Sequence, residues 1–474
     1  MSTVTIYRMN HLRTTVALAL GRTARILSRR FHLGGGTSLP GQIARSIEPA
    51  ILTTICTALP DGVILIAGTN GKTTTSRMLA AIFEHTGEPL LHNRAGANLL
   101  PGLTTVAITD TDWRGRPRAR RALFETDEAA LPQAIAETRP RLVVLLNLFR
   151  DQLDRYGEID TIAGNWRRAL QTLPTTSTVV FNADDPAIAG LTEHLPARVI
   201  GFGLNDTRHA VAAATHIADS QFCQTCGYRY HYRHIFYAHI GHYTCPHCGR
   251  HRPDPQIALT TLEPRGLDGS ELQIRHPGGQ LQIHLPLPGL YNAQNALAAT
   301  AAALALGIAP AIIGAALTTF QAAFGRIERI TAGTNGPPML IALIKNPVGA
   351  SETVRMLTAT TTQPLHLLIA INDRFADGTD VSWLWDADFE PLAGRIARVT
   401  VSGTRAADMA LRLDYAGVDG AAITVIDDLP TALDTALATL PVGETLAVLP
   451  TYTAMLDLRA EIARRGWAKP FWET

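Results

Sequence analysis

The chain alternates between short apolar runs and longer segments with helical spacing. Apolar runs lie within residues 63–67, 141–147 and 178–182, and their length favours buried strands over helices. Residues 76–83 follow the first run with the spacing of a helix. Because apolar strands that alternate with helices are typical of parallel sheets covered on both faces, this region predicts an α/β fold.

This alternation breaks between residues 205 and 284, where histidine, tyrosine and cysteine are frequent. Only short alternating strands are expected here, at 272–274 and 281–285. A helical, alanine-rich stretch then runs from 291 to 324, and glycine and proline at 333–338 predict a linker. The pattern indicates an insertion of about 205–284 in the first α/β unit.

A second α/β alternation follows the linker. We expect strands at 339–344, 365–371 and 397–402, and helices at 350–358 and 387–395. The alternation continues to residue 450, which predicts a Rossmann-like C-terminal α/β domain.

The 474 residues are enough for about three domains. We expect an N-terminal helical segment, 1–60, that packs on a central domain, 61–330, followed by a C-terminal domain, 331–474. In the first segment, residues 9–33 are expected to form a basic amphipathic helix and residues 43–59 a second helix.

Composition and charge narrow the possible partners. The formal net charge is +1, which provides no basic field for a nucleic-acid backbone. No apolar stretch of about 18 residues is free of charge, so we expect no membrane span. Arginines flank the short apolar stretch 14–21, and contact of this basic helix with a membrane surface stays open.

A glycine-bearing turn joins the first apolar strand to the following helix. Backbone N–H groups in such a turn, together with the helix N-terminus, are suited to cradling phosphates. Lys72 would reach the terminal phosphates and Thr73 would bind Mg²⁺. The spacing is shorter than in the common P-loop, because position 66 is isoleucine and the nearest glycine is at 68. The candidate nucleotide-binding residues are Gly68, Thr69, Asn70, Gly71, Lys72, Thr73 and Thr74.

Lysine is rare in this chain. Only Lys72, Lys345 and Lys469 are present, and all other basic residues among the 42 Lys and Arg are arginine. A lysine that remains in such a chain can mark a position that needs a compact ammonium group. We therefore expect a functional role for Lys345 as well as Lys72, and none for Lys469 near the C-terminus.

Four of the five cysteines form two Cys-x-x-Cys pairs separated by eighteen residues. This spacing indicates a tetrahedral, structural Zn²⁺ site in a ribbon-like insertion. Cys56 stands alone in an apolar stretch and is expected in the core. The expected zinc ligands are Cys223, Cys226, Cys245 and Cys248. Five nearby histidines are alternative ligands that we expect on the ribbon surface, namely His231, His234, His239, His242 and His247.

Several separated motifs resemble the Mur ligase family, which joins amino acids to peptidoglycan precursors through acyl phosphates. Residues 68–73 resemble its short phosphate loop, and Asn-Ala-Asp-Asp-Pro at 182–186 resembles its nucleotide-side motif. Residues 289–299 resemble its adenine-contacting helix start, and Phe-Gly-Arg-Ile-Glu at 324–328 resembles its Gly-Arg-x-Glu motif.

The chain departs from ordinary Mur ligases in and after residues 147–157. Gln152 stands where they carry a metal-binding histidine, and no lysine follows it before Lys345 that could be carbamylated. The cysteine ribbon is also foreign to them. Together with the stretches 124–128 and 372–390, these departures resemble the MurT branch, the synthetase subunits of lipid II isoglutaminyl synthase.

This resemblance implies ATP-dependent amidation of the α-carboxylate of D-glutamate in the lipid II stem peptide, through an acyl phosphate, to D-isoglutamine. Lys72 would act on the phosphates, Thr73 and Glu125 would bind Mg²⁺, and Gln152 leaves a second metal site in doubt. Further nucleotide contacts implied by the resemblance are Asn292, Asn295 and Arg326.

The resemblance also implies a heterodimer with a GatD-type glutamine amidotransferase that supplies ammonia. An aspartate of the synthetase subunit would complete the partner's Cys-His pair. Asp373, at the end of an apolar strand, is the candidate, and Asp377 and Asp380 are rivals. The protein would lie in the cytoplasm, with peripheral membrane contact through its lipid-linked substrate.

Three alternatives stay open at this point. One is an ordinary amino-acid-adding Mur or folylpolyglutamate-type ligase, which would need no amidotransferase. Another is a P-loop ATPase that binds nucleic acid through the ribbon, which the low net charge disfavours. The third is a non-catalytic protein on a decayed ligase fold, which Lys72, Thr73 and Arg326 argue against.

Overall fold

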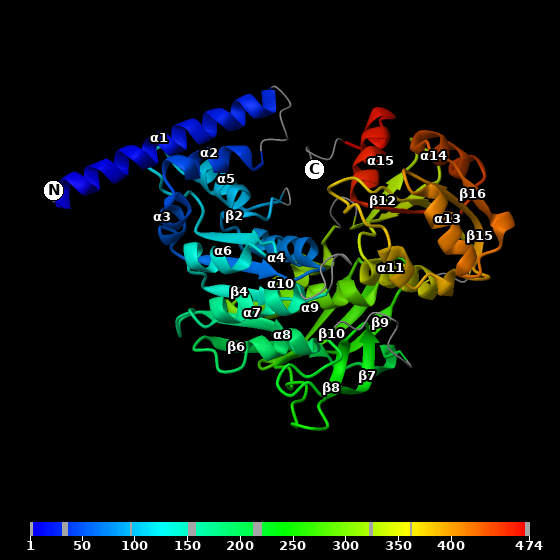
Figure 1. Ribbon diagram of the computed structural model, residues 1–474, viewed down its shortest axis with the longest axis horizontal. Helices are drawn as coiled ribbons and strands as arrows, with labels where there is room; N and C mark the ends of the chain where they lie inside the picture. The colour runs from blue at the N-terminus through cyan, green and yellow to red at the C-terminus, as the bar shows by residue number, and fades with distance from the viewer. Residues whose placement is uncertain are drawn as a thin grey trace.

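The computed structural model describes residues 3–30, 37–94, 97–149, 158–211, 220–321, 326–360 and 363–469 (Figure 1). Over these ranges the chain forms two α/β units, each built on its own sheet, and a separate two-stranded hairpin. In Figure 1 the C-terminal unit, coloured yellow to red, lies beside the central unit, whose colour runs from blue through cyan to yellow-green.

The central unit is built on a nine-stranded sheet. Its strands are β1 Val63–Ala67, β2 Leu90–His92, β3 Arg121–Glu125, β4 Leu142–Leu145, β5 Thr178–Asn182, β6 Arg198–Leu204, β9 Ile257–Pro264, β10 Ser270–His276 and β11 Gly279–Leu285. They lie in the order β11-β10-β9-β6-β5-β4-β1-β3-β2, parallel from β2 to β9 and antiparallel from β9 to β11. The predicted strands at 63–67, 141–147 and 178–182 are confirmed as neighbours within the parallel part.

Helices cover both faces of this sheet, as the fully apolar strands predict. Alternate residues of β1 show the two faces, because Ile64 and Ile66 join one buried cluster while Val63 and Leu65 join another. The first face is covered by α4 Lys72–Thr86, α9 Leu290–Ala305 and α10 Pro310–Thr318. The second is covered by α5 Leu100–Asp110, α6 Leu131–Thr138, α7 Glu158–Leu170 and α8 Pro186–Leu191.

Three N-terminal helices pack on the second face. They are α1 Thr3–Arg30, α2 Leu39–Ile47 and α3 Ile51–Thr57, and they contact α5 and α6. The single helix predicted at 43–59 is wrong, because the chain breaks between α2 and α3. Glu48 leaves the helical region with φ −130° and ψ 91°, as a residue that precedes a proline is disposed to do.

The C-terminal unit is built on a six-stranded sheet. Its strands are β12 Arg326–Thr331, β13 Pro338–Ala342, β14 Leu365–Ala370, β15 Ile396–Ser402, β16 Ile423–Val425 and β17 Leu446–Pro450. They lie in the order β12-β13-β17-β14-β15-β16, all parallel except β12. Its helices are α11 Pro347–Thr360, α12 Trp383–Asp386, α13 Ala406–Tyr415, α14 Leu429–Ala438 and α15 Tyr452–Arg464, with short 3₁₀ turns η4 Glu390–Leu392 and η5 Gly420–Ala422.

Two further predicted helices need correction. The helix expected at 387–395 is absent from this described stretch, which holds only the turn η4. Pro391 is the second residue of that turn, and Gly394, which follows two residues after its end, has φ +66°. The helix expected from 291 to 324 ends at Ala305, and α10 begins at Pro310 after Gly307 at φ +80°.

The separate hairpin is formed by β7 His231–Tyr237 and β8 Ile240–Thr244. It follows the short turn η3 Thr207–His209 and carries the cysteines. The range 205–284 predicted for the insertion also contains β9, β10 and β11, which extend the central sheet because β6 pairs with β9. The amphipathic alternation of β10 and β11 reflects their place at the edge of that sheet.

The predicted α/β class with two sheets is confirmed, and the ribbon is present as an inserted hairpin. The boundaries 1–60, 61–330 and 331–474 stay a proposal. The strand β12 spans the last of these boundaries and pairs with β13, so residues 333–338 lie in a hairpin of the C-terminal sheet. Among the helices in the described ranges, none has both the length and the apolar character that crossing a bilayer requires.

Candidate functional site

The predicted glycine turn, residues 68–71, lies between β1 and α4, and we call it the phosphate turn. Gly68 and Gly71 have φ of +147° and +85°, and Gly71 caps α4. A Cβ atom at Gly71 would lie 2.2 Å from Asn295 Oδ1, and one at Gly68 would lie 2.8 Å from Leu146 Cβ. Both positions therefore require glycine for conformation and for space. The turn leaves the N-terminus of α4 free to face an anion.

Lys72 is the first residue of α4, and its side chain is largely buried. Its Nζ donates to Thr69 O at 3.2 Å and lies 3.1 Å from Glu128 Oε2. Thr73 is half-buried in the same helical turn, and Thr74 is buried. The Glu128 carboxylate thus holds the Lys72 ammonium group at the turn, and a bound phosphate could take the place of that carboxylate.

Residues that follow β4 hold the phosphate turn in place through hydrogen bonds. Asn147 Nδ2 donates to Asn70 O at 3.0 Å, and Asn70 N donates to Asn147 Oδ1 at 2.8 Å. Thr69 N donates to Asn147 O at 3.0 Å, and Phe149 N donates to Thr69 Oγ1 at 3.0 Å. These bonds preorganise the turn, which lowers the ordering cost of binding.

A cavity opens at this turn, between the central and C-terminal units. The central unit contributes Asn70, Gly71, Thr74, Asn147, Phe149, Tyr237, Tyr291, Asn292 and Asn295, and the C-terminal unit contributes Ile327, Ala342, Leu343, Lys345, Asn346, Val348, Gly349, Glu352 and Thr353. Asn346 Nδ2 donates to Asn70 Oδ1 at 3.0 Å and so links the two units at the turn. The second of the three lysines, Lys345, therefore lies at the same cavity as the phosphate turn.

Glu352 gives this cavity a pH-sensitive wall. Burial raises the pKa of its carboxyl to about 7, against the opposing effect of the Arg355 guanidinium 2.7 Å away. A carboxyl with a raised pKa carries less negative charge near neutral pH than an ordinary glutamate does, which reduces repulsion of a polyphosphate.

The two glutamates of residues 124–128 occupy different places. Glu125 ends β3, next to Ile66 of β1, and is buried. Asn93 fixes its backbone, with Glu125 N donating to Asn93 Oδ1 at 2.9 Å. Glu128, which sequence reasoning passed over, is the residue that contacts Lys72. No sequence spacing indicates that contact, because it joins residues 56 positions apart.

The predicted nucleotide contacts on α9 lie at the cavity. Thr75 Oγ1 donates to Asn295 Oδ1 at 3.4 Å, which ties α9 to α4. Asn292 Nδ2 donates to Pro288 O at 2.7 Å. Arg326 begins β12, but its side chain lies outside the described part of the structure, and so does Gln152.

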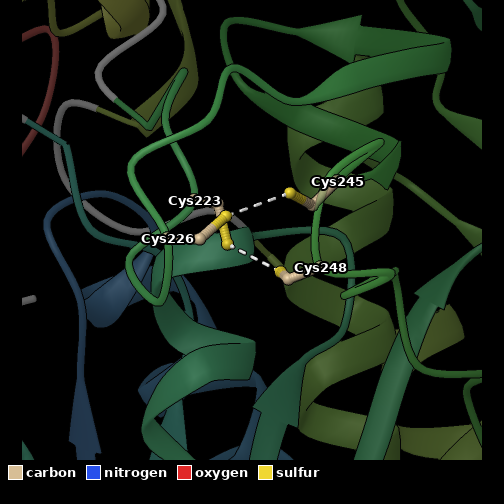
Figure 2. Close-up of side chains that lie close together, drawn as sticks. All are labelled: Cys223, Cys226, Cys245 and Cys248. Atoms are coloured by element: carbon tan, nitrogen blue, oxygen red, sulfur yellow. Dashed lines mark hydrogen bonds between the residues drawn. The ribbon is translucent and has the colours of Figure 1, made fainter.

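The four paired cysteines gather at one point (Figure 2). Their Sγ atoms all lie within 4.8 Å of one another, and both Cys223–Cys248 and Cys226–Cys245 have Sγ–Sγ distances of 3.5 Å. A tetrahedral Zn²⁺ with Zn–S of about 2.3 Å spaces its sulfurs by about 3.8 Å. The donor set and its spacing therefore fit a structural zinc ion, which would clamp the two ends of the ribbon together.

The histidines of the ribbon lie outside this cysteine cluster. His242 Nε2 lies 2.8 Å from Leu204 O, and His247 stacks on Tyr228. The expectation that all five lie on the surface is wrong for His239, which is fully buried with Nε2 3.3 Å from Asp185 Oδ2. His239 lies in the hairpin turn next to Ala238 and Ile240, and it is buried together with these apolar neighbours.

The three candidate aspartates in the C-terminal unit differ in their contacts. Asp373 is partly exposed just beyond β14, and a hydrogen bond from Thr404 Oγ1 at 2.8 Å lowers the pKa of its carboxyl, with help from Arg405. Asp377 is buried and accepts from Thr453 N at 2.7 Å, in the first turn of α15. Asp380 accepts from Ser382 N at 2.8 Å.

Comparison with known proteins agrees with this geometry. The family model of the Mur ligase middle domain matches residues 66–252, and that of the MurT ligase C-terminal region matches residues 343–455. A protein of Streptococcus pneumoniae named lipid II isoglutaminyl synthase (glutamine-hydrolyzing) subunit MurT is 34% identical over 456 residues, covering 96% of this chain and 98% of the relative. A Staphylococcus aureus protein with the same name is 32% identical over 454 residues, with the same coverage.

Solved structures share the fold at lower identity. MurF from Acinetobacter baumannii has a TM-score of 0.65 at 18% identity, covering 90% of this chain and 80% of that chain. Folylpolyglutamate synthase from Mycobacterium tuberculosis, complexed with ADP and AMPPCP, has a TM-score of 0.59 at 17% identity, covering 95% of this chain and 99% of that one. These likenesses concern the arrangement of the elements alone.

Proposed function

This chain belongs to the Mur ligase family, in its branch of MurT subunits of the glutamine-hydrolysing lipid II isoglutaminyl synthase, and we propose that it amidates the α-carboxylate of D-glutamate in the lipid II stem peptide. The observation that carries the proposal is the cavity between the two units, where the phosphate turn meets Lys345 and Asn346. A cavity between an ATP-binding turn and a second domain is a suitable place for phosphoryl transfer to a carboxylate.

The reaction has two steps. A carboxylate oxygen of the substrate attacks the γ-phosphorus of ATP, which forms an acyl phosphate and releases ADP. The nitrogen of ammonia then attacks the acyl carbon, the C–O bond to phosphate breaks, and the nitrogen loses a proton to leave the amide. Phosphorylation is needed because a carboxylate by itself has no good leaving group, and the protein's task is to position and neutralise charge.

In this proposal the phosphate turn holds the β- and γ-phosphates. The residues from Gly68 to Thr74 provide backbone N–H groups, and Lys72 moves from Glu128 to the phosphates. Asn292, Asn295 and Arg326 contact the rest of the nucleotide. Lys345 adds a second positive charge at the same cavity.

Mg²⁺ would be held by the Thr73 hydroxyl and the buried Glu125 carboxylate, since oxygen donors are the ligands that this ion prefers. When bound, it supplies positive charge to the phosphate oxygens during transfer. Gln152 stands where ordinary Mur ligases carry the histidine that binds a metal, and it lies outside the described residues.

Ammonia must come from another subunit. Burial raises the pKa of the Cys56 thiol to about 12, with a contribution from Glu137, and the other four cysteines form the cluster, so the chain offers no glutaminase nucleophile. We propose a heterodimer with a GatD-type glutamine amidotransferase, with Asp373 completing the partner's Cys-His pair. Phe375, which is 97% exposed in the same loop, is an apolar anchor that such a partner would bury.

The proposal is tested by incubating the chain with a GatD-type partner, lipid II, ATP, Mg²⁺ and glutamine, and by following the stem peptide by mass spectrometry. We expect the small mass loss that accompanies conversion of an acid to an amide. A product heavier by a whole amino acid would instead support an ordinary amino-acid-adding ligase. ATP turnover that required DNA or RNA would contradict both ligase functions.

We further propose that the protein works in the cytoplasm at the inner face of the membrane, and that α1 contacts anionic lipid. Residues 1–47 contain seven arginines and no acidic residue. Outside its packing face on α2 and α5, α1 exposes Val16, Leu20, Ile26 and Leu27, which are between 40% and 66% exposed. Exposed apolar residues among arginines are typical of helices that lie on anionic membrane surfaces.

The full-length protein should therefore sediment with vesicles that contain phosphatidylglycerol and not with vesicles of phosphatidylcholine alone. Replacing Leu20 and Leu27 together with serine is expected to weaken this binding, and high salt should weaken it further. Leu411→Ser is the matched control, because Leu411 is 50% exposed in the C-terminal unit. Equal binding by the double variant and the control would contradict a role for α1.

A further inference from the structure

The turn of the cysteine-bearing hairpin is buried inside the molecule. We call residues 236–240, where β7 passes into β8, the ribbon tip. Phe236, His239 and Ile240 are fully buried, and Tyr237 is 6% exposed. Phe236, Tyr237 and Ile240 belong to the same apolar cluster as residues of α9 and of the C-terminal unit. A zinc ribbon that served only to stabilise itself would not need its far end in this core.

The ribbon tip contacts elements from both units. The Tyr237 hydroxyl donates to Gln294 Oε1 on α9. The guanidinium of Arg355, on α11, donates to Phe236 O at 2.6 Å. The ring of Phe149, just beyond β4, lies 6.3 Å from that of Tyr237 and 4.7 Å from that of His239, between centroids. The tip therefore fills the junction between the central unit and α11.

Tyr237 also lines the cavity at the phosphate turn. It does so together with Phe149, Ile327 and Val348, which give the cavity an apolar part, while Asn70, Gly71 and Lys345 give it a polar part. The adenine base is the part of ATP suited to an apolar, aromatic wall, and base–ring contacts contribute substantially to nucleotide affinity. Because its hydroxyl is held by Gln294, the Tyr237 ring has a fixed position.

We propose that the ribbon tip is a positioning element of the nucleotide site, in which the Tyr237 ring forms the wall for the adenine base and the cysteine-bound metal keeps that wall in place. This inference rests on the proposed use of the cavity for ATP. An isolated two-stranded hairpin is marginally stable in water. A structural metal ion adds folding free energy, so the clamp at Cys223, Cys226, Cys245 and Cys248 would hold the tip in the junction.

The test compares two variants at one position, Tyr237→Phe and Tyr237→Leu, by calorimetric titration with a non-hydrolysable ATP analogue. Both remove the hydroxyl that Gln294 accepts from, and only the second removes the ring. We expect Tyr237→Phe to bind within about twofold of the unchanged protein and Tyr237→Leu to bind about tenfold more weakly, the size of one lost base–ring contact. Tyr228→Leu, on the exposed part of the ribbon, should bind normally.

The metal is tested separately with Cys226→Ser, by measuring zinc content and affinity for the same analogue. We expect loss of zinc and a loss of affinity at least as large as that of Tyr237→Leu. A folded, zinc-free variant with unchanged affinity would overturn the role of the clamp. If Cys226→Ser fails to fold, the comparison of Tyr237→Phe with Tyr237→Leu still tests the part of the ribbon tip in the nucleotide site, because neither substitution changes a metal ligand.

The outcomes also separate this inference from the function on which it rests. If the unchanged protein fails to bind the analogue, the proposed use of ATP at this cavity is wrong. If the unchanged protein binds and Tyr237→Leu binds equally well, the nucleotide site stands and the ribbon tip has no part in it.

Discussion

Replacement of Lys72 with alanine is expected to abolish lipid II amidation while the protein remains folded. The side chain lies at the first residue of α4, where its ammonium group can neutralise charge on the transferred phosphoryl group. Removing one preorganised group of this kind typically slows a reaction by about 10²- to 10³-fold or more. The rate of amide formation, followed by mass spectrometry at saturating glutamine, measures the loss.

The control for this prediction is Lys469→Ala, because Lys469 is another of the three lysines and is exposed. Lys72→Ala also leaves Glu128 without its ion-pair partner, so a thermal melt should accompany each assay. A cooperative transition with little amidation would support the assigned role. Normal amidation by Lys72→Ala would show that the turn does not serve phosphoryl transfer.

The sequence is informative where function depends on neighbouring residues. The phosphate turn occupies a short stretch, and its two glycines are required by backbone angles and close contacts that a linear motif already records. The four residues of the cysteine cluster could also be predicted, because two short Cys-x-x-Cys pairs identify the ligands almost completely. The parallel direction of the central strands could also be predicted, because continuous apolar runs that alternate with helices are typical of strands buried on both faces.

Contacts between distant segments could not be predicted in this way. The ion pair of Lys72 with Glu128 and the bond from Asn346 to Asn70 join residues far apart in the chain, and neither pair has a distinctive local pattern. Tyr237 lies in a short apolar run, 235–238, with histidines on both sides. This run is compatible with burial, but it does not show that the ring lines the cavity beside Phe149.

Helix boundaries failed for a different physical reason. Apolar spacing continues across Pro49 and across residues 387–395, and pattern alone therefore predicts helix at both places. A proline restrains the residue before it, and Gly394 takes a left-handed angle, so the backbone leaves the helical region. At these positions backbone geometry outweighs side-chain periodicity.

Replacement of Asp373 with asparagine is expected to uncouple glutamine hydrolysis from amidation. Asp373 is ionised at neutral pH, since the hydrogen bond from Thr404 and the charge of Arg405 lower the pKa of its carboxyl. If it orients the histidine of the partner's Cys-His pair, the neutral amide would support the wrong tautomer and slow glutamine hydrolysis by roughly 10²- to 10⁴-fold. Amidation supplied with ammonium salt should continue, because the phosphate turn is unchanged.

The ratio of glutamine-dependent to ammonium-dependent amidation distinguishes this role from a structural one. A carboxylate that merely holds Arg405 and Thr404 would, when replaced, lower the melting temperature and leave that ratio unchanged. Asp380→Asn is the matched control in the same loop, since Asp380 accepts from Ser382 N within its own turn. Asp377 is unsuitable for this purpose, because its contact with Thr453 anchors α15. If Asp380→Asn lowers this ratio and Asp373→Asn does not, Asp380 would be the aspartate that completes the partner's Cys-His pair.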